Sequence, residues 1–175
     1  PHIKAGLVAM LSVSITDRLG RASFLDRAVN AGLDGVILPD LDPEQAPDVA
    51  NLCDQRGLSL GLLVGPATTG SRLTSILDSC RGFVYLLARA GITGESKAAP
   101  EVEARVTELR KVTKLPIACG FGIGSPSQVE AVTKHADAAI VGSALVRRLQ
   151  NTTDPASCAS TFVQELRTGL AQPAR

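Results

Sequence analysis

Aromatic side chains are scarce in these 175 residues: there is one Tyr, there are four Phe, and there is no Trp. The scarcity leaves few surfaces on which nucleic-acid bases could stack, and it implies a core built from aliphatic side chains. Basic and acidic residues nearly balance, with 18 Lys and Arg against 17 Asp and Glu, and they are interspersed. We therefore expect no nucleic-acid-binding surface and no polybasic membrane anchor.

Other common signatures are missing as well. No apolar run approaches the roughly 20 residues that cross a membrane, and the first residues lack the architecture of a signal peptide. The four cysteines, Cys53, Cys80, Cys119 and Cys158, are far apart in the sequence, which argues against a zinc site or a disulfide framework. We expect one cytoplasmic domain over residues 1–175, with no metal and no cofactor.

What the sequence does contain is six short apolar runs that alternate with helical segments. The runs are continuous rather than interrupted by polar residues, as in parallel strands covered on both faces. The predicted strands are Ala5–Leu11, Gly35–Leu38, Ser59–Val64, Gly82–Leu87, Pro116–Cys119 and Ala138–Val141. Repetition of strand, loop and helix predicts an α/β fold made of successive βα units.

Residues at the ends of the helical segments support this division. Asp42 and Ser125 are each followed by proline and are predicted to be N-caps, and the last helix is expected after Asp154 and Pro155. Gly32 and Gly57 are predicted to end two helices. On one side of the last helix the apolar spacing places Phe162, Val163, Leu166 and Leu170.

Two glycine-containing turns follow the last two predicted strands. They are Gly120–Ile123 and Val141–Ala144. Glycine lets main-chain N–H groups approach an anion closely, and a helix that begins at Ser143 adds its positive end. Phosphate held between the loops after the last two strands is a recurrent feature of (β/α)8 barrels. The ordered pair of turns therefore predicts a phosphorylated small-molecule ligand.

Three further segments narrow the choice of family: Asp34–Leu41, Arg81–Leu87 and Ala88–Gly94. In this order, and followed by the two glycine turns, they closely resemble the alpha subunit of tryptophan synthase. The resemblance runs from about Gly6 to the last helix. It implies the TIM-barrel, or (β/α)8, fold family, with an incomplete barrel of about six parallel βα units that correspond to the family's third to eighth.

The resemblance also implies an activity. The family carries out retro-aldol cleavage of indole-3-glycerol phosphate to indole and glyceraldehyde 3-phosphate in tryptophan biosynthesis. It passes the indole to a pyridoxal-phosphate-dependent beta subunit, which is therefore a possible partner of this chain.

Site residues carry over from the family by position. The resemblance implies that the phosphate is held by Gly122, Gly142 and Ser143, with Phe121 and Gly94 beside it. It places Thr93 in a mobile loop that closes over the substrate. The implied indole side consists of Met10, Ser12, Ile37 and Tyr85, although plain core packing is an equal alternative for Met10 and Ile37.

The family's catalytic glutamate and aspartate belong to segments that precede the strand matched by Ala5–Leu11, so no catalytic residue is assigned in this sequence. Acid–base groups typically contribute ~10²–10⁴-fold each, so we expect binding with impaired catalysis. Asp40, at the C-terminal end of its predicted strand, is a less favoured candidate for a replacement, and it also adjoins the family's subunit-contact region.

Two other functions stay open. The chain could be a noncatalytic partner that regulates a beta subunit or senses phosphorylated metabolites. It could also be an isomerase or aldolase of another phosphate-binding barrel family, although the available lysines are expected in loops or on helical faces: Lys97, Lys111, Lys114 and Lys134.

The predicted sheet has two open edges, at Ala5–Leu11 and Ala138–Val141. Apolar strand edges without a partner favour pairing with another chain, and six strands close poorly into a barrel. We therefore expect a homo-oligomer that associates through these edges.

Overall fold

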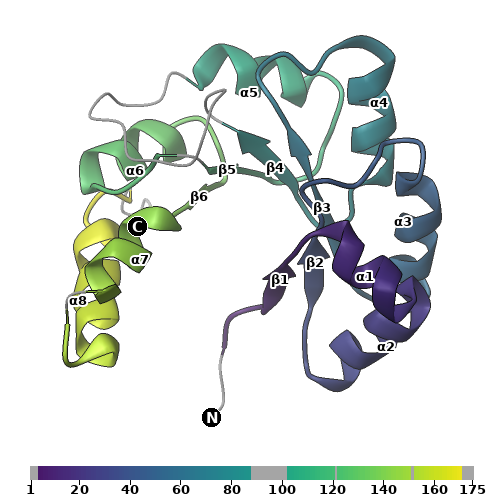
Figure 1. Ribbon diagram of the computed structural model, residues 1–175. Helices are drawn as coiled ribbons and strands as arrows, with labels where there is room; N and C mark the ends of the chain where they lie inside the picture. Colours follow the sequence, from purple (N-terminus) through teal and green to yellow (C-terminus); the bar gives the residue numbers. More distant parts are fainter. Residues whose placement is uncertain (1–3, 88–101, 121, 151, 171–175) are drawn as a thin grey trace. The chain divides into compact units, whose positions relative to one another are not determined.

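The computed structural model describes residues 4–87, 102–120, 122–150 and 152–170 (Figure 1). They belong to two compact units, Pro1–Tyr85 and Leu86–Arg175. The residues Thr93, Gly94 and Phe121, for which the resemblance implies ligand contacts, lie outside the described part of the chain.

Strands and helices alternate along the first unit, and α2, α3 and α4 gather on one side of its strands (Figure 1). The elements are β1 (Val8–Met10), α1 (Val13–Leu19), α2 (Arg21–Asn30), β2 (Gly35–Ile37), α3 (Ala46–Asp54), β3 (Ser59–Val64) and α4 (Gly70–Ser79). The strands β1, β2 and β3 are parallel neighbours, as the apolar runs predict. The strand β4 (Val84–Leu87) crosses the division between the units.

The second unit continues the alternation. Its elements are α5 (Glu103–Arg110), β5 (Ile117–Gly120), α6 (Pro126–Thr133), β6 (Ala138–Ile140), α7 (Ser143–Gln150) and α8 (Pro155–Arg167). The strands β5 and β6 are again parallel neighbours. The strand prediction is confirmed at both ends for Ser59–Val64, and the other strands differ from their predicted ranges by one to three residues at an end.

The helix-end predictions are mostly confirmed. The Ser125 hydroxyl accepts a hydrogen bond from the Gln128 N–H at 3.4 Å, and the Asp154 carboxylate accepts one from the Ser157 N–H at 3.1 Å. Gly32 follows α2 with φ of 81°, and its N–H and that of the next residue bond back into the helix. This glycine-ended arrangement is the Schellman motif.

The prediction for Asp42 is wrong. Its carboxylate accepts from the N–H of Glu44 at 3.0 Å, which makes a local turn rather than a helix cap. The helix α3 begins only at Ala46, after Gln45, which makes no capping bond through its side chain.

The four apolar positions predicted for one side of the last helix are divided between the interior and the surface. Phe162 and Leu166 are buried, whereas Val163 and Leu170 are about half exposed. The prediction that all four share one side is thus confirmed only for the pair spaced four residues apart. Val163 comes one position after Phe162, which rotates its side chain out of the packed face, and Leu170 lies beyond Arg167, where α8 ends.

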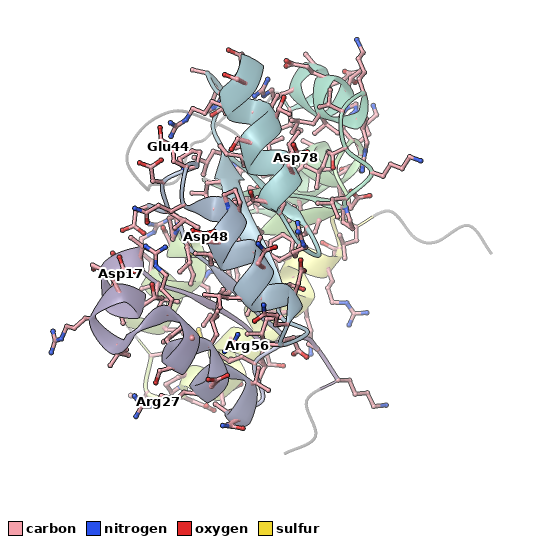
Figure 2. All side chains as sticks on the ribbon, turned by 90° about the vertical axis from the view of Figure 1, so that its right-hand side faces the viewer. Asp17, Arg27, Glu44, Asp48, Arg56 and Asp78 are labelled. Carbon is pink, nitrogen blue, oxygen red and sulfur yellow. The ribbon has the colours of Figure 1, made fainter. Side chains whose placement is uncertain are left out.

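Charged side chains cover the outward faces of the first unit's helices (Figure 2). Asp17, Arg27, Asp48 and Asp78 lie on α1, α2, α3 and α4 respectively. None of the described helices is both long and apolar enough to cross a membrane.

Candidate functional site

The two glycine turns lie at the same edge of a two-strand ladder. The strands β5 and β6 are parallel, and Gly120 at the end of β5 is in register with Ile140 at the end of β6. Gly122 and Gly142 each come two residues later, so both turns leave the sheet at its C-terminal edge. This is the edge at which barrels of this class place their ligands.

Gly122 has φ of 80°, a conformation that a residue with a Cβ rarely adopts. The turn then passes through Gly124, whose N–H donates to the Gln128 side-chain oxygen at 2.8 Å. The Ser125 cap and this bond together fix the start of α6. The turn therefore has a defined geometry that depends on glycine at position 122.

Gly142 is exposed, and a Cβ built on it would meet no protein atom within 4 Å. Its carbonyl accepts from the N–H of Val146 at 3.2 Å, so Gly142 is the residue from which α7 begins. Ala144 in the first turn of the helix is buried and anchors it. The first N–H groups of a helix have no partner within the helix, and the helix dipole makes this end positive.

The residues assigned to the indole side belong to the first unit. Met10 and Ile37 are register partners on β1 and β2, and Ile37 is in turn the partner of Gly61 on β3. Met10 is 55% exposed, whereas Ile37 and Tyr85 are each 8% exposed. The side chain on β1 is thus exposed to solvent, whereas those on β2 and β4 are buried.

Gly61 and Phe83 were missed by the sequence analysis. A Cβ on Gly61 would lie 2.9 Å from the Phe83 ring and 3.1 Å from the Ile37 side chain. Both side chains therefore lie over the β3 backbone at the point where glycine leaves room for them. A lone glycine inside an apolar strand is the sequence signal for such a close approach.

Ser12 is not a free hydroxyl. Its Oγ donates to the Asp40 carboxylate at 2.6 Å, and it also accepts from the N–H of Ser14 at 3.3 Å. A hydrogen bond of 2.9 Å joins the Ser12 and Ser14 hydroxyls. Any contact of Ser12 with a ligand would accordingly be a packing contact.

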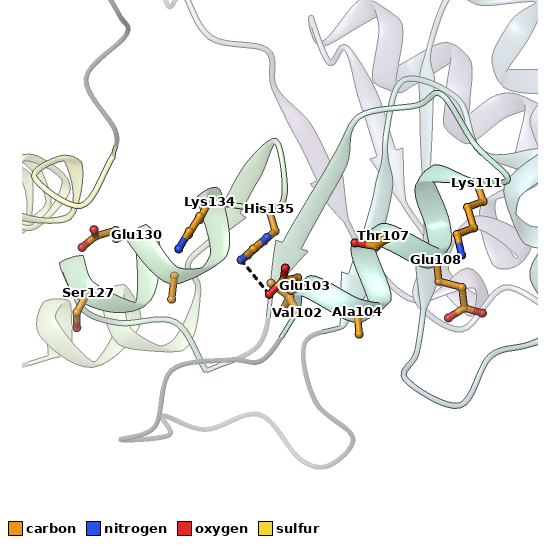
Figure 3. A pocket seen from close by; sticks show the side chains of 11 residues that line it. Val102, Glu103, Ala104, Thr107, Glu108, Lys111, Ser127, Glu130, Lys134 and His135 are labelled. Atoms are coloured by element: carbon orange, nitrogen blue, oxygen red, sulfur yellow. Dashed lines mark ion pairs between the residues drawn. The ribbon is translucent and has the colours of Figure 1, made fainter.

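A cavity of about 940 Å³ lies elsewhere, between α5 and α6 (Figure 3). It is lined by side chains of both charges, among them Glu103, Lys111 and Lys134. His135 lies there too, 3.8 Å from a Glu103 carboxylate oxygen. Mixed charges on two exposed helical faces describe a solvated depression, and we assign no ligand to it.

The lysines do not suit Schiff-base chemistry in the described part of the chain. Lys111 and Lys134 are exposed at the ends of α5 and α6, and Lys114 is exposed in the segment before β5. None of these three is on a strand, and Lys97 lies outside the described residues. This weakens the isomerase or aldolase alternative.

Three of the four cysteines have the environment of core residues. Cys53, Cys80 and Cys119 are buried, and burial raises the pKa of the Cys119 thiol to about 12. All four cysteines are unpaired. Across the described residues, no group of His, Cys, Asp and Glu side chains could hold a metal ion.

Comparison with known proteins places this chain in a family. The sequence profile described as "Tryptophan synthase alpha chain" matches residues 1–174. The chain belongs to the tryptophan synthase alpha chain family. The resemblance in the glycine turns and in the segments before them is thus confirmed.

Curated relatives carry the same name. The chain is 41% identical over 158 residues to the tryptophan synthase alpha chain of Rhodopirellula baltica, covering 89% of this chain and 57% of that one. It is 40% identical over 174 residues to that of Methanosarcina mazei, covering 98% of this chain and 63% of the relative. The chain thus spans about three-fifths of the length of these relatives.

Solved structures agree on the fold. The alpha subunit of tryptophan synthase from Legionella pneumophila superimposes with a TM-score of 0.84 at 28% identity, covering 96% of this chain and 63% of that one. A tryptophan synthase from M. tuberculosis in its aminoacrylate-bound form superimposes with a TM-score of 0.82 at 28% identity, with the same coverage. The fold class is therefore that of the (β/α)8 barrel family, represented here by six parallel strands and their helices.

Proposed function

We propose that this chain binds indole-3-glycerol phosphate as a tryptophan synthase alpha-type protein. The observation that carries the proposal is the pair of turns after β5 and β6, which leave one sheet edge in register. Gly122 is in a conformation that requires glycine, and Gly142 leaves open space before the first turn of α7. Main-chain N–H groups and the positive helix end would hold the phosphate there, with Ser143 contributing its hydroxyl.

The indole side of the ligand is proposed to contact the first unit and the start of β4. Met10 and Ile37 are adjacent on neighbouring strands, and Tyr85 has a ring that packs and a hydroxyl that can bond. We add Phe83 to this set, since its ring lies over Gly61 beside Ile37. The resemblance assigns Thr93, Gly94 and Phe121 to the same ligand.

Gly142→Ala tests the phosphate site. A Cβ at this position meets no protein atom, and Gly142 has no positive φ, so the variant should fold. The methyl group would occupy space that the phosphate needs, so we expect inorganic phosphate to bind about tenfold more weakly, as for loss of one or two charge-assisted hydrogen bonds. Isothermal titration calorimetry measures this affinity.

The matched control is Gly6→Ala in the first unit. A Cβ on Gly6 makes only an ordinary contact, 3.6 Å from the Asp34 carboxylate, and Gly6 also has no positive φ. This variant should bind phosphate as the unchanged chain does. Equal affinity in all three proteins would contradict the phosphate site, as would no measurable binding to the unchanged chain.

Catalysis by the 175-residue polypeptide alone is proposed to be impaired. Asp40 is the described carboxylate that ends a ring-side strand, and both of its oxygens already accept hydrogen bonds. It is therefore poorly placed to exchange protons with a substrate.

Release of indole from indole-3-glycerol phosphate, with and without a beta subunit, measures the activity. Turnover equal to that of the longer relatives would contradict impairment, and an effect on the beta subunit without turnover would favour a regulatory role.

A further inference from the structure

The carboxylate of Asp40 joins the ends of two strands in the first unit. One oxygen accepts from the Ser12 hydroxyl at 2.6 Å, and the other accepts from the N–H of Val13 at 2.8 Å. Ser12 comes two residues after β1 and Val13 is the first residue of α1, whereas Asp40 comes three residues after β2. The carboxylate therefore links the turn between β1 and α1 to the turn that follows β2 by two hydrogen bonds.

The hydrogen-bond pattern fixes the direction of each bond at Ser12. A serine hydroxyl has one proton and can accept two hydrogen bonds. Because Asp40 in its ionised form can only accept, the Ser12 proton goes to Asp40. The bond between the two serine hydroxyls is then donated by Ser14, and Ser12 accepts from both the hydroxyl and the N–H of Ser14. Every bonding position of the Ser12 hydroxyl is thus used.

The position of Asp40 is itself well determined. The N–H of Leu41 donates to the carbonyl of Leu38 at 3.3 Å, which closes the turn that contains Asp40. Leu38 and Leu41 are both buried and fix the turn on either side. Asp40 is exposed, yet the hydrogen bonds from Ser12 and Val13 hold the pKa of its carboxyl below the usual value. The group is therefore a charged acceptor at neutral pH.

We propose that Asp40 is a positioning residue for the ring side of the ligand site. By holding Ser12 and the first N–H of α1, it keeps the C-terminal end of β1, and with it Met10, next to Ile37 on β2. This role rests on the proposed function, because it assigns Asp40 to the side that receives the indole ring. It also separates Asp40 from proton transfer, since the carboxylate acts through Ser12 and not on the substrate.

Asp40→Ala, Asp40→Asn and the control Asp42→Ala test this role. Asp42 is a carboxylate in the same loop that accepts a local hydrogen bond, from the N–H of Glu44 at 3.0 Å. The probes are indole for the ring side and inorganic phosphate for the glycine turns, each titrated by NMR into the 175-residue chain. The rate of amide hydrogen exchange of Val13 and Ser14, measured without ligand, reports whether the hydrogen bonds to Asp40 and Ser12 are formed.

We expect Asp40→Ala to weaken indole binding about tenfold and to speed exchange of the Val13 amide by a similar factor, as for loss of a charge-assisted hydrogen bond. Phosphate affinity should be unchanged, which a general loss of folding would not allow. Asp40→Asn keeps one acceptor oxygen and should fall in between, and Asp42→Ala should match the unchanged chain.

Two results overturn the proposal. One is that Asp40→Ala and Asp42→Ala have the same indole affinity and the same Val13 exchange rate. The other is that the unchanged chain binds phosphate but not indole, which leaves the phosphate site standing. If it binds neither probe, the proposed function fails as a whole, and the positioning role fails with it.

Discussion

Two aspartates make the same pair of bonds in the two units, each one residue before a strand. Asp34 donates its N–H to the carbonyl of Leu7 at 2.7 Å and accepts the N–H of Leu7 on its side chain at 2.7 Å. Asp137 does the same with Ile117, at 3.0 and 2.7 Å. In both cases the next residues are the first register pair of the ladder. The aspartate thus sets where two parallel strands begin to pair.

Asp137 has an additional partner. Arg110 forms an ion pair with its carboxylate and also donates to the carbonyl of Leu115 at 3.2 Å. Burial disfavours the charged form of Asp137, but the Ile117 N–H and Arg110 outweigh this and lower its pKa. A carboxyl whose pKa is lower in the folded state stabilises the fold above its unfolded pKa. That contribution is lost as the pH falls through the folded pKa.

We expect Asp137→Ala to lower the free energy of unfolding by about 1 kcal/mol at pH 7, as for one lost hydrogen bond of a partly exposed carboxylate. The difference from the unchanged chain should narrow below pH ~4, where the carboxyl becomes protonated. Urea unfolding at a series of pH values measures both effects. Glu165→Gln is the control, because it breaks only the exposed ion pair with Arg148. Equal loss in both variants, or a loss that does not change with pH, would show that the strand contact contributes nothing.

At the scale of elements, apolar runs and glycine ends predicted the alternation of strands and helices, and the parallel pairing within each unit confirms it. Ser125 caps α6 as predicted, and Asp154 caps α8, because each side chain reaches an N–H three residues ahead. Asp42 fails because its carboxylate reaches the N–H of Glu44, only two residues ahead. Whether such a side chain caps a helix or closes a local turn depends on the backbone conformation at the turn, because Ser and Asp can do either.

The boundary between α1 and α2 was not predictable from apolar spacing. Gly20, with φ of 78°, both ends α1 and precedes α2, and its carbonyl accepts from the N–H of Phe24. In the candidate site, the glycine turns were predictable from the sequence because a backbone conformation such as that of Gly122, with φ of 80°, favours glycine. The hydrogen bond between Ser12 and Asp40 was not predictable, because it joins the side chains of residues that are 28 positions apart in the sequence.

At the scale of the whole molecule, the sequence predicts a single barrel-type domain over residues 1–175, and this stays a prediction. One cooperative transition in differential scanning calorimetry would support it, because a domain with one core unfolds as a unit. Two separate transitions would contradict it.

The expected association through strand edges also belongs to this scale. Among the described residues, β1 pairs with β2 alone, and Leu7, Val8 and Met10 are 40%, 38% and 55% exposed. The main chain of Leu7 and of Leu11 bonds toward β2 and its flanks. Because successive residues of a strand point their main-chain groups in opposite directions, those of Val8 and Met10 face away from β2.

An apolar edge with main-chain groups directed outward favours pairing with a second copy of the chain. We therefore expect the 175-residue polypeptide to form an oligomer at micromolar concentration, as measured by light scattering after size-exclusion chromatography. Val8→Lys places a charge on this edge and should shift the population to monomer. Val163→Lys changes an apolar side chain on α8 that is 49% exposed, more than Val8, and should leave the oligomer intact. A stable monomer of the unchanged chain, or equal dissociation by both lysine variants, would show that the β1 edge does not hold the copies together.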